Sequence, residues 1–279
     1  MEALLYNQET IEKYLRTKWL GRNLLFCDSV DSTNDRVHQL AVDAAPEDAP
    51  HGTVVAADRQ TAGKGRRGRA WESPAGANIY FSLLLRPTFA PDKASMLTLL
   101  IAYGVKCGIE RQMVSDASQC GIKWPNDVVI DGKKVCGILT EMHLEGNSID
   151  HVIVGVGVNV GKQNFAPELV DKATSLEDAC GQAFDRSRLL ADILEVFEEE
   201  YESFAAEDAI ADLKFFKEKY NACLVNRDRE VCVLDPKGEY RGIARGINDT
   251  GELLVELQDG SLKEVYAGEV SVRGIYGYT

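Results

Sequence analysis

The sequence predicts an α/β protein in which a large domain over residues 1–223 precedes a small all-β domain over residues 224–279. Through the first domain, apolar strand-like runs alternate with segments of helical apolar periodicity. From about residue 224 the pattern changes to short β segments separated by the turn sequences DPKG, NDTG and QDGS. A length of 279 residues suits one large and one small domain.

The elements of the large domain follow from local patterns. Ser32 and Thr33 predict a helix start, because short oxygen side chains accept hydrogen bonds from exposed N–H groups. Asp131 and Gly132 predict a hairpin turn between two apolar strands. In chain order we expect a helix over 2–20, a strand over 24–30, a helix over 33–45, strands over 53–60 and 78–87, a helix over 94–112, hairpin strands over 122–130 and 134–145, a strand over 150–160, and helices over 186–204 and 209–220.

Charge and cysteine content exclude several classes of protein. With 44 acidic and 31 basic residues the formal net charge is −13, which opposes binding to nucleic acid or to an anionic membrane. The sequence contains no apolar run of the roughly 18 residues that a membrane span needs, and no signal peptide. Seven cysteines without a CxxC pair predict reduced thiols in a cytoplasmic protein, and with four scattered histidines no zinc site is expected.

The sequence GKGRRGRAW at residues 63–71 concentrates four cations on flexible backbone. It matches the dinucleotide-binding pattern GxGxxG, but no helix follows directly and residues 84–90, about 20 positions on, contain no acid, so that interpretation fails. Glycines allow backbone N–H groups to approach an anion, and arginine grips phosphate or carboxylate oxygens with a planar fork. We therefore expect an anion clamp that becomes ordered when a ligand binds, rather than a solvated basic loop.

Three further stretches are candidates for binding. Lys123 in KWPND stands between apolar residues and suits a fixed point charge, although such turns are common. Simple alternation puts Lys134 on the strand face of Cys136 and Ile138, where it is either an exposed edge lysine or a cation buried beside an anion. The two glycines of VGVGVNV make room for a packed helix or for a ligand.

The chain contains no recognisable catalytic triad or carboxylate pair, so its visible chemistry is positive charge and glycine. This set fits reactions in which charge on phosphate is stabilised without a general base. Taken together, the motifs DSTND (31–35), ADRQTAGKGRRGRAWESPAGANIYFSLLLRP (57–87), KWPNDVVIDGKKVCGIL (123–139) and GVGVNV (155–160) resemble those of biotin protein ligases, also called biotin–[acetyl-CoA-carboxylase] ligases. One departure is Lys64, where the family usually has arginine.

The resemblance implies a mixed-sheet catalytic domain with a small C-terminal β-barrel. It also implies a two-step reaction. Biotin and ATP, with Mg²⁺, give biotinyl-5′-AMP, and biotin then passes to one lysine of a biotin carboxyl carrier protein or domain. Homodimers occur in the family. Some relatives begin with a DNA-binding domain, and because only 31 residues precede Ser32 we expect this chain to lack it and to bind no nucleic acid.

The resemblance also implies roles for individual residues. Arg66 and Lys123 would stabilise charge during catalysis, and no metal ligand is assigned. By motif position, biotin would contact Ser32, Thr33, Asn34, Gln60, Lys64, Gly65, Arg66 and Lys134. ATP or AMP would contact Arg67, Arg69, Trp71, Lys123, Asn126 and Asn159.

Two rival functions remain at this stage. A lipoate or octanoate protein ligase shares the fold and the acyl-adenylate chemistry, but we would expect a triple-glycine run there, and this chain has GKGRRG instead. A non-catalytic biotin or nucleotide sensor would bind ligand and leave every acceptor protein unmodified.

Overall fold

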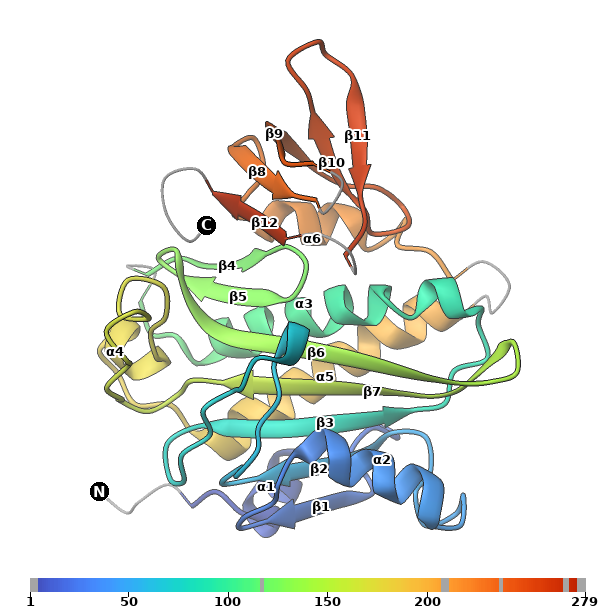
Figure 1. The fold of residues 1–279 in the computed structure, drawn as a ribbon. Coiled ribbons are helices and arrows are strands. Elements are labelled where there is room, and N and C mark those ends of the chain that lie inside the picture. Colours follow the sequence, from blue (N-terminus) through green and yellow to red (C-terminus); the bar gives the residue numbers. More distant parts are fainter. Residues whose placement is uncertain (1–4, 116–117, 207–210, 236–237, 268–270, 275–279) are drawn as a thin grey trace.

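A seven-stranded mixed sheet forms the centre of the large domain (Figure 1). The computed structural model describes the chain except residues 1–4, 116–117, 207–210, 236–237, 268–270 and 275–279. β1 and β2 run parallel, and every other neighbouring pair in this sheet is antiparallel. In sheet order the strands are β1 (Leu24–Cys27), β2 (Thr53–Ala57), β3 (Ile79–Leu85), β7 (Ser148–Val158), β6 (Lys133–Glu145), β5 (Asp127–Ile130) and β4 (Cys120–Lys123). The predicted α/β fold on a mixed sheet is confirmed.

Helices cover the two faces of this sheet unequally (Figure 1). The long helices α3 (Met96–Gln112) and α5 (Arg186–Ala205) pack together on one face and bury the main apolar core. They approach closely because Gly108 has no side chain; a Cβ there would lie only 2.8 Å from Cγ1 of Ile193. On the other face α2 (Thr33–Asp43) lies across β2, β3 and β7 over a smaller apolar cluster. The rest of that face is left for the site described below.

Two predicted helices are shorter than expected. Asn7 and Thr10 form a reciprocal cap at the start of α1, and the helix ends at Tyr14 because Leu15 is extended. The predicted continuation to residue 20 is therefore wrong. The predicted helix over 209–220 is wrong at its start: residues 211–213 have no regular secondary structure, residues 214–216 form a turn, and α6 begins only at Lys217, while residues 209–210 lie outside the described part of the chain. The remaining short elements are α1 (Gln8–Tyr14), η1 (Arg66–Gly68), η2 (Pro91–Lys93), α4 (Leu176–Cys180) and α6 (Lys217–Cys223).

The C-terminal part forms a separate antiparallel sheet of five strands, which confirms the predicted all-β module. In sheet order they are β11 (Leu262–Val265), β10 (Leu253–Glu256), β9 (Tyr240–Ile247), β8 (Glu230–Leu234) and β12 (Ser271–Gly274). The buried indole of Trp124 donates a hydrogen bond to the carbonyl of Gly251 at 3.0 Å and so joins this sheet to the large domain. No described helix is long and apolar enough to cross a membrane.

Candidate active site

The start of α2 supplies a buried polar group. Ser32 is the N-cap residue, and the side chains of Ser32, Thr33 and Asn34 are all buried. The Thr33 backbone N–H donates to Oε1 of Gln60 at 2.9 Å, which ties the helix start to the segment after β2. Ser82 on β3 donates to Oγ1 of Thr33 at 2.7 Å or to Oδ1 of Asn34 at 2.6 Å. Oxygen and amide groups are therefore held rigidly at this end of the sheet face.

Glycines on β6 and β7 clear the floor beside this polar group. A Cβ at Gly155 would overlap the amide of Asn34, and one at Gly157 would overlap the indole of Trp71. Gly137 on β6 also lies under Trp71, with 2.8 Å from an added Cβ to the ring. Both interpretations of VGVGVNV hold in part: Gly155 makes room for Asn34 in the first turn of α2, whereas Gly157 lies under the Trp71 indole beside the candidate site.

The basic loop folds back on itself over the sheet. The Gly65 N–H donates to the Arg69 carbonyl at 2.7 Å, and the Trp71 N–H donates to the Gly63 carbonyl at 2.9 Å. A Cβ at Gly63 would lie 2.5 Å from the Trp71 carbonyl, so this pairing requires glycine there. Arg67 adopts a left-handed φ of 59°, which bends the loop tip. All four cations of the loop line the cavity described below.

The cations of the loop lie in different environments. Arg66 is half-buried and donates to Oδ1 of Asn126 at 2.7 Å and to the Ala267 carbonyl. Burial lowers the pKa of the Arg66 guanidinium, which still remains charged at neutral pH. Lys64 forms an ion pair with Asp35 on α2, and this contact raises the pKa of Lys64.

Two lysines lie at the β5–β6 side of the site. Lys123 at the end of β4 is only 5% exposed. The Lys134 Nζ atom lies 2.6 Å from Oδ1 of Asp127 and 5.1 Å from the centre of the Trp71 ring. Of the two possibilities left by the sequence, Lys134 is thus the cation beside an anion. Asn159 is buried at the end of β7 and donates to the Thr174 carbonyl at 3.3 Å.

The strand face assigned to Lys134 by simple alternation is wrong. Along the β5–β6 pair, Val128 faces Cys136 but the next residue, Val129, faces Lys134, so Val135 is an extra residue in β6. Val135 and Cys136 both enter the main core, whereas the Lys134 ammonium lies near Gly137 on the opposite face. A bulge of this kind reverses the alternation and turns Lys134 toward the site.

All fourteen residues that the sequence singled out line one cavity of about 920 Å³. They come from α2, the segment after β2, the basic loop, β4, the β4–β5 turn, β6 and the end of β7. Seven cations and three carboxylates line this cavity, in a chain whose net charge is −13. The arrangement can hold a polar ring at the α2 end and an anionic group beside the lysines and arginines. The cations in the lining are Lys64, Arg66, Arg67, Arg69, Lys123, Lys134 and Lys172.

The sequence did not predict every part of the lining. The motif KWPND indicates Lys123 but not Asp127, although Asp127 provides the ion-pair partner of Lys134. The segment over residues 163–173 also lines the cavity with Phe165 and Lys172, and the Lys134 N–H donates to the Lys172 carbonyl at 2.8 Å. Its sequence has no periodicity or motif that would have indicated this place. Val272 contributes from β12 of the C-terminal sheet.

The chain matches two family models. Residues 26–159 match the biotin/lipoate A/B protein ligase family, and residues 228–273 match the biotin protein ligase C-terminal domain. Among curated proteins, the bifunctional ligase/repressor BirA of Bacillus subtilis is 40% identical over 92% of this chain and 76% of its own length. The biotin–[acetyl-CoA-carboxylase] ligase of Mycobacterium tuberculosis is 34% identical over 93% of this chain and 94% of its own length.

A solved structure agrees with these matches. The biotin protein ligase from Aquifex aeolicus in complex with biotin and ATP superimposes with a TM-score of 0.76 and is 33% identical. The superposition covers 91% of this chain and 99% of the other. The two family models and this structure together span both the mixed sheet with its cavity and the C-terminal sheet.

Proposed function

Because the chain belongs to the biotin protein ligases of the biotin/lipoate A/B protein ligase family, we propose that its cavity converts biotin and ATP to biotinyl-5′-AMP and pyrophosphate, and then passes biotin to a lysine of a biotin carboxyl carrier domain. The observation that carries this proposal is the cavity itself. Its lining places the buried polar side chains at the start of α2 next to a cluster of lysines and arginines. A lipoate or octanoate ligase is not favoured, because the C-terminal match is to a biotin ligase domain.

In the first step, the biotin carboxylate would attack the α-phosphorus of Mg-ATP, the bond to the β-phosphate would break, and pyrophosphate would leave. The carboxylate is already ionised at neutral pH, so the step needs no general base. Its barrier comes from bringing one anion against another. The buried Lys123 ammonium and the half-buried Arg66 guanidinium support a role in offsetting this repulsion, because fixed cations act strongly where water is excluded. Magnesium would enter bound to ATP.

The ligand roles follow the same division of the cavity. Ser32, Thr33, Asn34 and Gln60 would hold the ureido ring of biotin, which carries both donors and acceptors. Lys64, Gly65, Arg66 and Lys134 would lie near the biotin carboxyl group. The nucleotide would contact Arg67, Arg69, Trp71, Lys123, Asn126 and Asn159.

In the second step, an unprotonated lysine amine of the carrier domain would attack the biotinyl carbonyl, and AMP would leave. The phosphate is a good leaving group, so the cavity needs only to retain the adenylate until the acceptor docks. Contacts from Arg66 to Asn126 and to the Ala267 carbonyl hold the basic loop against both domains, which supports a closing role for this loop.

Exchange of labelled pyrophosphate into ATP tests the first step. We expect exchange that depends on biotin and is absent with lipoate or octanoate alone. Exchange with lipoate but not with biotin would overturn the substrate assignment. A failure of exchange with every acid, despite biotin binding, would instead indicate a sensor without ligase activity.

Three further properties belong to the proposal. We infer a domain boundary near residue 223, with a catalytic domain over 1–223 and a C-terminal domain over 224–279. We also infer a cytoplasmic location, because all seven cysteines are free and such thiols persist in a reducing compartment. A homodimer is a hypothesis from the resemblance, and sedimentation velocity with and without biotinyl-5′-AMP would test it.

A further inference from the structure

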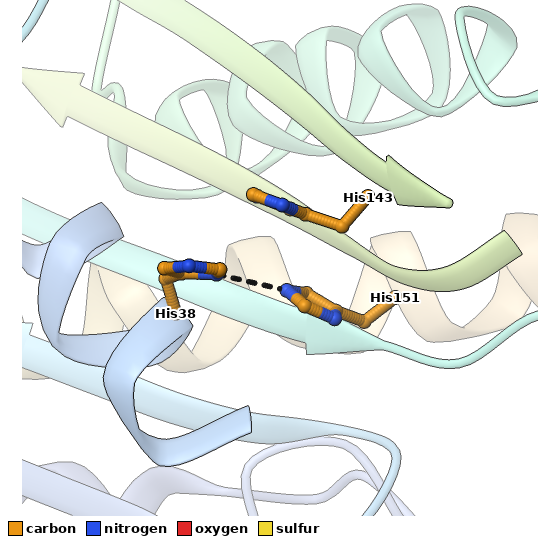
Figure 2. A group of neighbouring side chains, drawn as sticks. All are labelled: His38, His143 and His151. Carbon is orange, nitrogen blue, oxygen red and sulfur yellow. Dashed lines mark hydrogen bonds between the residues drawn. The ribbon is translucent and has the colours of Figure 1, made fainter. Parts of the chain in front are cut away.

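Three of the four histidines of this chain meet at a place outside the cavity (Figure 2). His38 lies on α2, while His143 on β6 and His151 on β7 are directly opposite each other across the strand pair. One ring nitrogen from each residue lies within 4.8 Å of the others. The scattered histidines and the lack of a CxxC pair predict no zinc site, but the fold brings three of these histidines together.

The hydrogen bonds of the group fix which nitrogens carry lone pairs. Nδ1 of His151 contacts the Asp150 carboxylate, which requires a proton on Nδ1 and leaves Nε2 of His151 as an acceptor. Nε2 of His151 lies 3.1 Å from Nδ1 of His38, which then acts as the donor. His143 makes no hydrogen bond within the described part of the chain, so one of its ring nitrogens offers an unused lone pair.

This arrangement has the features of a metal site with histidine ligands. Two imidazole nitrogens bound to one tetrahedral Zn²⁺ at ~2.0–2.1 Å lie roughly 3.3 Å apart, close to the observed separation between His38 and His151. A carboxylate on the far nitrogen of a ligand histidine is a common support in zinc sites, and Asp150 supplies it here.

The rings need to adjust for binding. His143 stacks on His38 with ring centres 4.2 Å apart and on His151 with ring centres 4.4 Å apart. Figure 2 shows His143 lying over the hydrogen-bonded pair formed by the other two rings. A rotation of the half-buried His143 would turn its lone pair toward the pair, and the proton on Nδ1 of His38 would move to Nε2. Both changes involve side chains only.

We propose that His38, His143 and His151 form a binding site for one divalent transition-metal ion of the zinc class. Three imidazoles suit Zn²⁺, and solvent would supply the fourth ligand. The ion would join α2 to the β6–β7 hairpin. The site is separate from the cavity, since none of the three histidines lines it. The proposal therefore does not rest on the ligase function.

Titration of the metal-free full chain with ZnCl₂ in a calorimeter tests this proposal. We expect one Zn²⁺ per chain with a Kd below about 10 µM. The variants His143→Gln and His38→Gln should bind at least about tenfold more weakly. The matched control is His51→Gln, because His51 is the fourth histidine and lies away from the group against Trp19. It should bind as the unmodified chain does.

Two further measurements keep the outcome clear if a variant folds poorly. With Co²⁺ in place of Zn²⁺, the unmodified chain should show visible d–d bands without a sulfur-to-cobalt charge-transfer band, because no cysteine belongs to the site. Zn²⁺ should also raise the Tm of the unmodified chain and of His51→Gln. Absence of binding in the unmodified chain, unchanged binding in His143→Gln, or a cobalt–thiolate band would each overturn the proposal.

Discussion

The amide of Asn34 occupies the space that a side chain on Gly155 would need. The contact joins the first turn of α2 to the centre of β7, and it fixes where the polar group of the cavity can lie. Ser82 donates to the same amide oxygen at 2.6 Å, while the amide nitrogen of Asn34 donates to Glu141. Because Asn34 is held from three strands, it has little freedom to move aside.

Gly155→Ala should therefore weaken biotin binding. The added methyl group would push Asn34 out of position and disturb the proposed ureido contacts, and we expect the KM for biotin to rise by about tenfold or more. The KM for ATP should change much less. Steady-state kinetics with each substrate varied in turn would measure this, and an equal rise in both values would contradict the assignment of Asn34 to biotin.

Gly157→Ala should give the reciprocal result. An added Cβ there would overlap the Trp71 indole, which we assign to the nucleotide. The KM for ATP should rise by about tenfold, with a smaller change for biotin. The two glycines lie two residues apart on the same strand, so each variant is the matched control for the other. A stronger effect on biotin than on ATP in Gly157→Ala would show that Trp71 is misassigned.

Arg66→Lys should make the cavity leak biotinyl-5′-AMP. The substitution keeps the charge but loses the fork that reaches both Asn126 and the Ala267 carbonyl. Release of the adenylate should accelerate by about tenfold, consistent with the loss of one or two charge-assisted hydrogen bonds. Rapid filtration of preformed complex would follow the release. Arg36→Lys, on the exposed side of α2 beside Gln39, is the control and should retain the adenylate normally.

Lys123→Met should slow adenylation more than it weakens biotin binding. Removing a buried cation near the proposed α-phosphate should lower the rate of pyrophosphate exchange by about 100-fold. Biotin affinity, measured by calorimetry without ATP, should change by less than about threefold. Comparable losses in rate and in affinity would indicate that Lys123 only binds ligand.

Stability should decrease below neutral pH. Burial lowers the pKa of His51 from 6.5, and Nδ1 of this ring accepts the Arg86 N–H at 2.9 Å, which requires it to be unprotonated. The unfolded chain binds this proton more readily than the folded chain. The contribution of neutral His51 to the free energy of unfolding is therefore fully present above about pH 6.5, and it is lost as the pH falls through the lowered pKa. The pKa values of His143 and His151 shift in the same direction.

Thermal melts between about pH 7.5 and pH 5 would test this, because carboxylates contribute mainly below that range. His51→Gln should show a shallower fall in Tm across the window, since Gln can accept the same hydrogen bond without titrating. A Tm that is constant over the window, or an equally steep fall in His51→Gln, would contradict the expected role of His51.

Local sequence patterns anticipated much of this structure because the site is built from continuous motifs. Gly65, Arg66, Lys123 and Lys134 could be selected from composition and spacing, and the cavity brings them together. The sequence did not indicate which way each side chain points. The bulge at Val135 reversed the face of Lys134, and no local signal marks an extra residue in a strand.

Contacts between distant segments account for what the sequence could not show. The partner of Arg66 in the C-terminal part, the carbonyl of Ala267, is 201 residues away along the chain. His38 and His151 are 113 residues apart and meet only because α2 crosses β7. Such pairs are set by the packing of α2 and the C-terminal sheet on the large domain, and periodicity carries no information about them.

Transfer of biotin to protein is the central claim, and the intact mass of a biotin carboxyl carrier domain tests it most directly. The domain would be incubated with the full chain, biotin and Mg-ATP, alongside a matched carrier domain whose acceptor lysine is replaced by arginine. We expect the mass of the unmodified carrier to increase by one biotinyl group and that of the arginine variant to stay unchanged. A carrier that gains no mass while biotinyl-5′-AMP accumulates, or a gain in both carriers, would contradict the account.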